Sequence, residues 1–238
     1  MLTSILQTSE AYRPHSASAL GRQGVRKNIR RARVLDDSHI ERVLIHINKN
    51  SNSPASDELK VLFSYYAGLR ACEIAAMTMD CVVDADGRIG RHILVSRHAA
   101  KGGRERIVPM HPKIRDALVR FRDAHPDERI LSFSARRGNV RYQNASAVKT
   151  WFLKVYKEVG LEGCSSHSGR RTFITRMARL ANLHGSSLRD VQLLAGHSCM
   201  TTTAAYIDPA DDLARLVSAL GVPSTPCPTT LNNKGENA

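Results

Sequence analysis

Three short segments of this chain hold side chains that could bind and cut a phosphodiester. They span residues 68–74, 166–173 and 194–206, and they combine Arg, His and Tyr with few acidic neighbours. Each segment alone has an ordinary explanation, because charged residues three apart on a helix, such as Arg70 and Glu73, often form a surface ion pair. Together they favour phosphate chemistry, since guanidinium groups present planar, always ionised donors to phosphate oxygens.

A tyrosine would be the nucleophile of such a site. Attack by the hydroxyl of Tyr206 would give a covalent phosphotyrosine, which keeps the energy of the broken bond for rejoining. A tyrosine has an unperturbed pKa of about 10, so nearby cations or a base must help it to ionise. The departing sugar oxygen needs a proton, and a lysine on a mobile hairpin tip is a suitable general acid.

Other catalytic chemistries lack their sequence signatures. Cys164 with His167, and His197 with Cys199, could supply metal ligands, but neither loop has the usual zinc-site spacing, and no cluster of carboxylates suits magnesium. There is no G-x-S-x-G nucleophile motif and no P-loop for ATP. The sequence therefore predicts a site without metal, nucleotide or other cofactor.

The order and spacing of these motifs resemble the tyrosine recombinase, or phage integrase, family over roughly residues 34–220. The first arginine of that family lies in a G-L-R-x-x-E segment, which residues 68–73 match. Its catalytic lysine lies on a β-hairpin before a basic strand, which residues 101–109 match with Lys101 at the tip. Any one of these motifs is weak evidence, whereas several in the right order are specific.

The second half of the resemblance covers the remaining motifs. The H-x-x-R motif of the family is matched by His167 and Arg170, with Gly169 where leucine is common. The L-G-H segment is matched by residues 195–197, and the family's tyrosine follows nine residues later, as Tyr206 does here. The change at Gly169 concerns local packing rather than the chemistry.

The resemblance implies six catalytic residues, namely Arg70, Lys101, His167, Arg170, His197 and Tyr206. The two arginines and the second histidine would bind the scissile phosphate, and the lysine would protonate the leaving 5′ oxygen. The first histidine would act as acid or base, and the tyrosine would form a 3′-phosphotyrosine. Glu73 is expected to support the helix that carries Arg70 rather than to contact DNA.

The net charge indicates a polyanionic partner. The 238 residues include 35 Lys+Arg against 22 Asp+Glu, which gives a formal charge of +13. An arginine-rich codon bias is the other explanation, but residues 1–35 and 88–122 are basic while residues 36–87 between them are acidic. This uneven distribution favours a one-sided basic surface that binds double-stranded DNA. Four arginines are candidate DNA contacts: Arg97, Arg104, Arg106 and Arg171.

Hydrophobic periodicity predicts the elements that would hold these residues. Helices are expected to start after the capping residues at 36–38 and at Ser53-Pro54. Short strands are expected at 81–83, 93–95 and 107–108, with residues 101–103 as the tip between the last two. Further helices are expected near residues 112–122, 145–159, 168–181, 187–194 and 211–220. The predicted fold class is α+β, a mainly helical catalytic domain with a small three-stranded antiparallel sheet.

Three regions of the chain are predicted: a basic flexible arm at 1–33, a catalytic domain at 34–221 and a disordered tail at 222–238. The arm also has the composition of a mitochondrial transit peptide. Family members normally carry an N-terminal helical core-binding domain of about 100 residues, so a minimal or truncated form is expected. Five cysteines without a C-x-x-C pair favour a reducing, cytosol-like compartment, and no apolar run reaches membrane length. The resemblance implies a cytoplasmic, nucleoid-associated protein encoded by a bacterium or phage.

We therefore expect a site-specific DNA recombinase that serves integration, excision or inversion. By resemblance it would act as a homo-tetramer on DNA, with the helix at 211–220 packing on a neighbour, and a DNA-bending accessory protein is a further possible partner. One alternative is a degenerate integrase that only binds DNA, which the complete catalytic set disfavours. Another is a type IB topoisomerase, which the short spacing from Arg70 to Tyr206 disfavours.

Overall fold

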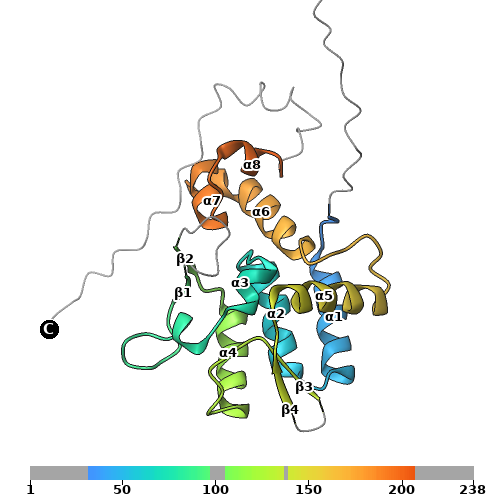
Figure 1. Ribbon diagram of the computed structural model, residues 1–238. Helices are drawn as coiled ribbons and strands as arrows, with labels where there is room; N and C mark the ends of the chain where they lie inside the picture. Colours follow the sequence, from blue (N-terminus) through green and yellow to red (C-terminus); the bar gives the residue numbers. More distant parts are fainter. Residues whose placement is uncertain (1–31, 97–104, 137–138, 207–238) are drawn as a thin grey trace, which may run out of the picture. The chain divides into compact units, whose positions relative to one another are not determined.

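The computed structural model describes residues 32–96, 105–136 and 139–206, most of which are helical (Figure 1). The helices are α1 (Asp37–Asn50), α2 (Pro54–Tyr66), α3 (Ala71–Ala75), α4 (Pro112–Ala124), α5 (Ala145–Glu158), α6 (Ser168–Ala181), α7 (Leu188–Ala195) and α8 (Met200–Ala204). The strands are β1 (His92–Val95), β2 (Arg106–Pro109), β3 (Phe133–Arg136) and β4 (Asn139–Tyr142).

Local sequence signals explain where the helices begin and end. Asp36 caps α1, because its carboxylate accepts a hydrogen bond from the backbone N–H of His39 at 2.8 Å. Pro54 stands at the start of α2, where its missing N–H costs nothing. Ser187 caps α7, which ends at Gly196 in the left-handed conformation. The helices predicted within the described ranges are thereby confirmed.

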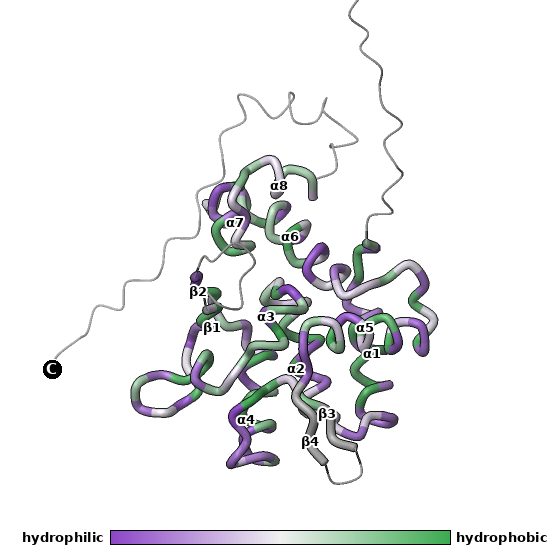
Figure 2. The backbone as a smooth tube through the Cα atoms, in the orientation of Figure 1, coloured by the Kyte–Doolittle hydropathy of each residue, from purple (hydrophilic) through white to green (hydrophobic). Residues whose placement is uncertain are grey.

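The main hydrophobic core surrounds α2. Leu59 and Phe63 of this helix are almost fully buried, together with Val43 of α1, Leu118 of α4 and Phe152 of α5. Figure 2 shows hydrophobic and hydrophilic segments alternating along α1 and α4, as expected for helices that bury one face. This core fixes the α2–α3 connection, which carries the first of the candidate motifs.

A second, smaller core joins α6, α7 and α8. Phe173 and Ile174 of α6 are buried with Val191 and Ala195 of α7, and Tyr206 packs against this cluster. The three helices lie beside one another in Figure 1. The motifs of Arg170 and His197 therefore share one small packing unit, although these two residues are 27 positions apart in the chain.

Two antiparallel hairpins are present where one three-stranded sheet was predicted. β1 and β2 pair as expected, with Ile93 opposite Val108. The expected strand at 81–83 is instead a 3₁₀ turn at Met79–Cys81 followed by a bridge from Val83 to Ile89. That part of the prediction was wrong because the turn at 84–87 reverses the chain at once. The α+β class itself is confirmed.

The hairpin of β3 and β4 and the short helix α8 were not predicted. β3 and β4 pair antiparallel, but each is only four residues long, so its alternation of apolar and polar residues is too short to indicate a strand. The predicted hairpin tip at 101–103 and the predicted helix at 211–220 lie outside the described residues. Within the described ranges, no helix is long and apolar enough to cross a membrane.

Candidate active site

Arg170 lies at the centre of the candidate site. It occupies the first turn of α6 and is only 2% exposed. One end of its guanidinium donates to the carbonyl oxygen of Gly68, and Nη2 donates to the carbonyl oxygen of Ala195 at 2.6 Å and contacts Nε2 of His197 at 2.9 Å. This side chain therefore joins all three sequence segments in which catalytic residues were predicted.

Gly68 brings the first motif against α6. Its φ of +64° is left-handed, and a Cβ at this position would lie 2.4 Å from the ring of Phe173. Both facts require glycine here. The G-L-R start of the motif is thus explained by backbone geometry and by close packing, and it leaves the Gly68 carbonyl free to receive Arg170.

Arg70 and Glu73 form a partly buried ion pair at the start of α3. The Arg70 side chain is 20% exposed, whereas that of Glu73 is fully buried. Nη1 of Arg70 donates to Oε1 of Glu73 at 2.8 Å, and the Arg70 backbone N–H donates to Oε2 at 2.8 Å. Nη2 of Arg70 also approaches the carbonyl oxygen of Gly196 at 3.3 Å. Glu73 thus supports the Arg70 helix from inside, as the sequence predicted.

Hydrogen bonds outweigh burial in setting the charge of Glu73. Burial alone raises a carboxyl pKa, but donors from Arg106 and Arg70 together lower the pKa of Glu73 to about 2. The carboxylate is therefore ionised at neutral pH. It offsets part of the positive charge that the arginines concentrate in the site.

His197 is held between two partners. Its Nε2 faces Arg170, which can only donate, so Nε2 accepts and the proton of the neutral ring lies on Nδ1. Nδ1 contacts the hydroxyl of Thr203 at 2.9 Å. Burial and then the positive charges of Arg170, Arg70 and Arg106 lower the pKa of His197 to about 4. The ring is therefore neutral at physiological pH.

Tyr206 lies against His197. The two rings are stacked with centroids 5.6 Å apart and planes inclined by 25°. The backbone of Tyr206 is anchored as well, because its carbonyl oxygen accepts from Thr175 of α6 at 3.1 Å and its N–H donates to Thr203 at 3.0 Å. The predicted nucleophile is thereby joined to the predicted phosphate ligands through α6 and α8.

His167 precedes α6 and is exposed. Loss of solvent around the ring and the nearby cations Arg170, Lys149 and Arg70 lower its pKa below the ordinary value of 6.5. Its imidazole is therefore largely unprotonated at neutral pH. A neutral imidazole can accept a proton, which is what a general base requires.

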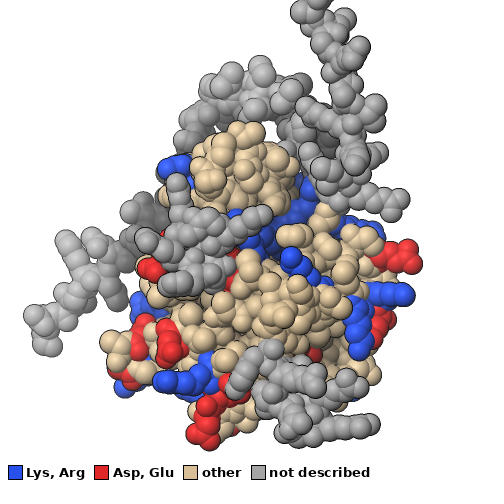
Figure 3. Space-filling model, viewed as in Figure 1, with Lys and Arg blue, Asp and Glu red and all other residues tan. Residues whose placement is uncertain are grey.

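The remaining predicted site residues fall into two groups. Lys101, Arg97 and Arg104 lie outside the described residues. Arg171 is half-buried on α6, whereas Arg106 turns inward and is only 8% exposed. Figure 3 shows Lys and Arg side chains gathered where the unit of α6, α7 and α8 meets the rest of the described protein.

Sequence reasoning missed two contributors to the site. Thr203 is fully buried against His197, and its only sequence signal is a position three residues before the tyrosine. Arg106 was expected to contact DNA, but its guanidinium binds Glu73. A basic residue in a basic stretch gives no indication that it faces the interior.

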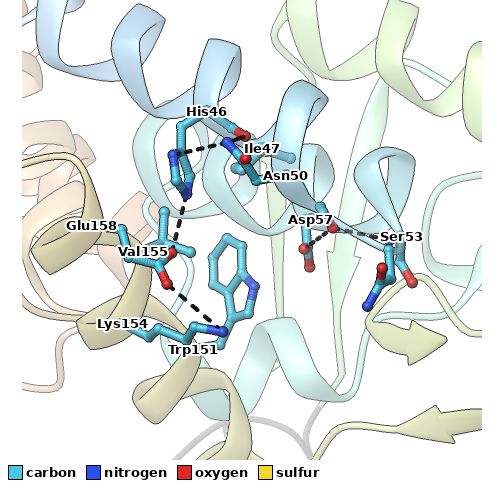
Figure 4. A pocket seen from close by; sticks show the side chains of 11 residues that line it. His46, Ile47, Asn50, Ser53, Asp57, Trp151, Lys154, Val155 and Glu158 are labelled. Atoms are coloured by element: carbon cyan, nitrogen blue, oxygen red, sulfur yellow. Dashed lines mark hydrogen bonds and ion pairs between the residues drawn. The ribbon is translucent and has the colours of Figure 1, made fainter. Parts of the chain in front are cut away.

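A pocket elsewhere in the described protein contains none of the predicted site residues. It measures about 530 Å³ and lies between α1, residues 51–53 and α5 (Figure 4). In its wall, Glu158 contacts His46 at 3.1 Å and Lys154 at 3.7 Å. In the described ranges no group of three or more His, Cys, Asp and Glu residues could hold a metal ion.

Removing the charge of Glu73 is expected to destabilise the fold in a pH-dependent way. The folded-state pKa near 2 lies below the ordinary 4.5, so the ionised group stabilises the protein above pH 4.5 and the contribution is lost as pH falls toward 2. Glu73→Gln should lower the free energy of unfolding by roughly 3 kcal/mol at pH 7, at 1.36 kcal/mol per pKa unit. Denaturant unfolding at pH 7 and pH 3 measures this difference.

The matched control is Glu58→Gln. Glu58 accepts from Arg120 at 2.6 Å, but the Arg120 side chain is largely exposed. An exposed ion pair contributes about 1 kcal/mol or less. An equal loss of stability in both variants, or a Glu73→Gln effect that does not shrink at low pH, would contradict the pH-dependent contribution.

The fold and this set of linked arginines, histidine and tyrosine define the catalytic domain of a tyrosine recombinase. The model of the phage integrase family matches residues 33–212. The chain belongs to the phage integrase family, and the resemblance seen in the sequence is confirmed.

Individual relatives agree with this assignment. The chain is 28% identical over 177 residues to tyrosine recombinase XerD of Shewanella oneidensis, covering 72% of this chain and 55% of the relative. It is 30% identical over 152 residues to tyrosine recombinase XerA of Pyrococcus horikoshii, covering 63% and 49%. The chain thus spans about half the length of the curated relatives it matches.

Solved structures share the fold. A crystal structure of XerA recombinase matches with a TM-score of 0.57 and 22% identity, over 81% of this chain and 66% of that one. The Tn1549 transposon integrase in complex with transposon right end DNA matches with a TM-score of 0.61 and 19% identity, over 80% and 66%.

Proposed function

We propose that this protein is a site-specific recombinase that cleaves and rejoins double-stranded DNA through a covalent 3′-phosphotyrosyl intermediate. The observation that carries the proposal is the linked cluster in which Arg170 joins the Arg70 segment to His197, and His197 stacks on Tyr206. DNA as the partner is supported by the relatives, because several solved neighbours are complexes with DNA.

The cleavage step is a displacement at phosphorus. The hydroxyl oxygen of Tyr206 forms a bond to phosphorus, the bond from phosphorus to the 5′ oxygen breaks, and the phosphate stays on the 3′ side. The neutral ring of His167 takes the tyrosine proton, and Lys101 gives a proton to the leaving 5′ oxygen. Rejoining reverses each of these transfers.

The site can stabilise the negative charge that develops on the phosphate, because its hydrogen-bond donors are already held in place. As the equatorial oxygens gain negative charge, Arg70 and Arg170 provide guanidinium donors that need no reorganisation. For His197 to donate from Nε2, the proton must move from Nδ1, and the Thr203 hydroxyl can accept in one state and donate in the other. Thr203 therefore suits both tautomers of the histidine.

The proposal also covers the domains of the protein, its assembly on DNA, its location in the cell and its DNA contacts. We propose that residues 34–221 are the catalytic domain, with residues 1–33 as a DNA-binding arm and 222–238 as a tail. Recombination would take place in a homo-tetramer on DNA, in the cytoplasm and at the nucleoid, with or without a DNA-bending partner. Arg97, Arg104 and Arg171 would contact the duplex.

Three parallel assays test the function. Repeats in the DNA that flanks the gene supply candidate sites for a nicked duplex that traps the covalent complex, for a two-site recombination assay and for relaxation of a supercoiled plasmid. The proposal expects trapping and recombination. Relaxation without recombination would indicate a topoisomerase, and binding without trapping would indicate a degenerate integrase.

The general-acid role of Lys101 gives a separate prediction. Lys101→Ala should slow cleavage of ordinary DNA by on the order of 10²-fold, as loss of a general acid does. The rate should largely recover on a substrate whose bridging 5′ oxygen is replaced by sulfur, because a thiolate leaves without a proton. Single-turnover cleavage of both substrates measures this. Equal slowing on both would mean that Lys101 positions DNA instead.

A further inference from the structure

Arg106 is directed into the protein, although it lies in the most basic stretch of the sequence. It is the first residue of β2, and its side chain is only 8% exposed. Nη1 and Nη2 donate to the two carboxylate oxygens of Glu73 at 2.8 and 2.9 Å. Its Nε donates to the carbonyl oxygen of Leu194 at 2.9 Å. Three donors of the guanidinium are thus used inside the protein.

Glu73 is shared between Arg106 and Arg70. The same two carboxylate oxygens that receive Arg106 also receive Nη1 and the backbone N–H of Arg70. Without Arg106 this buried carboxylate would keep only the donors of Arg70 and would attract that side chain more strongly. Arg106 and Arg70 therefore share the same two acceptor oxygens.

Arg106 also packs beneath the turn that presents His197. Leu194, which accepts from Arg106, lies near the end of α7, and Gly196 follows with a φ of +63°. A Cβ on Gly196 would lie 3.0 Å from Nη1 and 3.2 Å from Nε of Arg106. The guanidinium thus fills the space under the backbone immediately before His197.

We propose that Arg106 is a positioning residue for DNA cleavage, which holds Arg70 and the His197 turn in register with the strand that follows Lys101, and that it makes no contact with DNA. Three elements meet at its guanidinium: β2, α3 through Glu73, and the end of α7 through Leu194. A planar fork is required to bind both oxygens of a carboxylate together, so lysine cannot replace it. This inference rests on the proposed function for its catalytic readout.

Single-turnover cleavage and DNA binding test the proposal together. Arg106→Gln and Arg106→Lys should both lower the cleavage rate by about 10²-fold, a loss that small misplacements of catalytic groups produce. Affinity for the duplex should stay within about 3-fold, and the slope of log affinity against log salt should not change by the ~0.9 expected for one lost phosphate contact. Arg129→Gln is the control for loss of one exposed charge, because the Arg129 side chain is 80% exposed.

A double-mutant cycle tests whether Arg106 acts through Glu73. The Arg106→Gln/Glu73→Gln variant should cleave no more slowly than the slower single variant, because both changes break the same interaction. Multiplied losses in the double variant would overturn the proposal. A normal rate for Arg106→Lys, or a salt slope reduced by about one phosphate, would also overturn it.

An NMR titration of His197 in the DNA-free protein provides a readout that needs no activity. The charged groups that act on this ring are Arg170, Arg70, Arg106 and Glu73. Loss of Arg106 removes one repulsive cation, so the pKa of His197 should rise from about 4 toward 6.5. Arg129→Gln should leave it unchanged, and an unchanged pKa of His197 in folded Arg106→Gln would overturn the packing on which the proposal depends. If the pKa rises as expected but the unaltered protein traps no DNA, the proposed function fails and the arrangement around Arg106 stands.

Discussion

Tyr206→Phe is expected to abolish the covalent complex with DNA completely. The change removes only the hydroxyl, which is the sole group of this side chain that can attack phosphorus. The ring can still stack on His197, and the backbone contacts with Thr175 and Thr203 do not involve the hydroxyl. DNA binding should therefore persist. The measurement is the amount of labelled nicked duplex that becomes attached to protein on a denaturing gel.

Tyr66→Phe is the matched control. Tyr66 is a half-buried tyrosine at the end of α2. Its hydroxyl accepts from Lys113 at 3.1 Å and its ring stacks on His111, and neither partner is a candidate site residue. This variant should trap DNA at the unaltered level. Undiminished trapping by Tyr206→Phe would remove Tyr206 from the mechanism and require another nucleophile.

Arg170→Lys is expected to slow cleavage by on the order of 10²-fold or more, which is the cost of losing a preorganised donor to the transition state. A lysine ammonium is a single point charge, whereas Arg170 spans the carbonyl oxygens of Gly68 and Ala195 and also contacts His197. The lysine variant keeps the buried positive charge, so the loss reports on geometry. Single-turnover cleavage at saturating protein separates this effect from weaker DNA binding.

A second arginine on the same helix provides the control. Arg176 of α6 contacts both carboxylate oxygens of Asp37 at 3.0 and 3.2 Å, and it is more than one-third exposed. Arg176→Lys removes a similar fork outside the candidate site and should leave cleavage unchanged. Thermal unfolding of both variants shows whether each is folded. A normal rate for folded Arg170→Lys would assign Arg170 to the packing of α6 alone.

The sequence determined which residues are candidates and most of the helices that hold them. The order and spacing of the motifs were sufficient to identify the family. The residues that carry this match are Arg70, His167, Arg170, His197 and Tyr206. Helix periodicity was sufficient for α1, α2 and α4 to α7, because an amphipathic helix repeats its apolar side chains within a few residues. Both signals are local.

Strand pairing was predicted less well. The pairing of β1 with β2 was predicted because two short apolar runs flank a Gly-Gly pair in the sequence. The third predicted strand was wrong, and the hairpin of β3 and β4 was missed. Short strands contain few residues, and their pairing depends on partners that sequence pattern does not specify.

Only the tertiary structure decided which charged side chains face inward. Arg106 is one of several arginines in a basic stretch of the sequence, and nothing in that stretch sets it apart. Its guanidinium nevertheless binds Glu73, which lies 33 positions earlier in the chain. Thr203 is likewise an unremarkable threonine until it meets His197. A buried charge is stable only when donors and acceptors from other elements surround it. Those partners are brought together by the packing of α3, α7 and β2, so the direction of each side chain follows from the fold and not from its own segment.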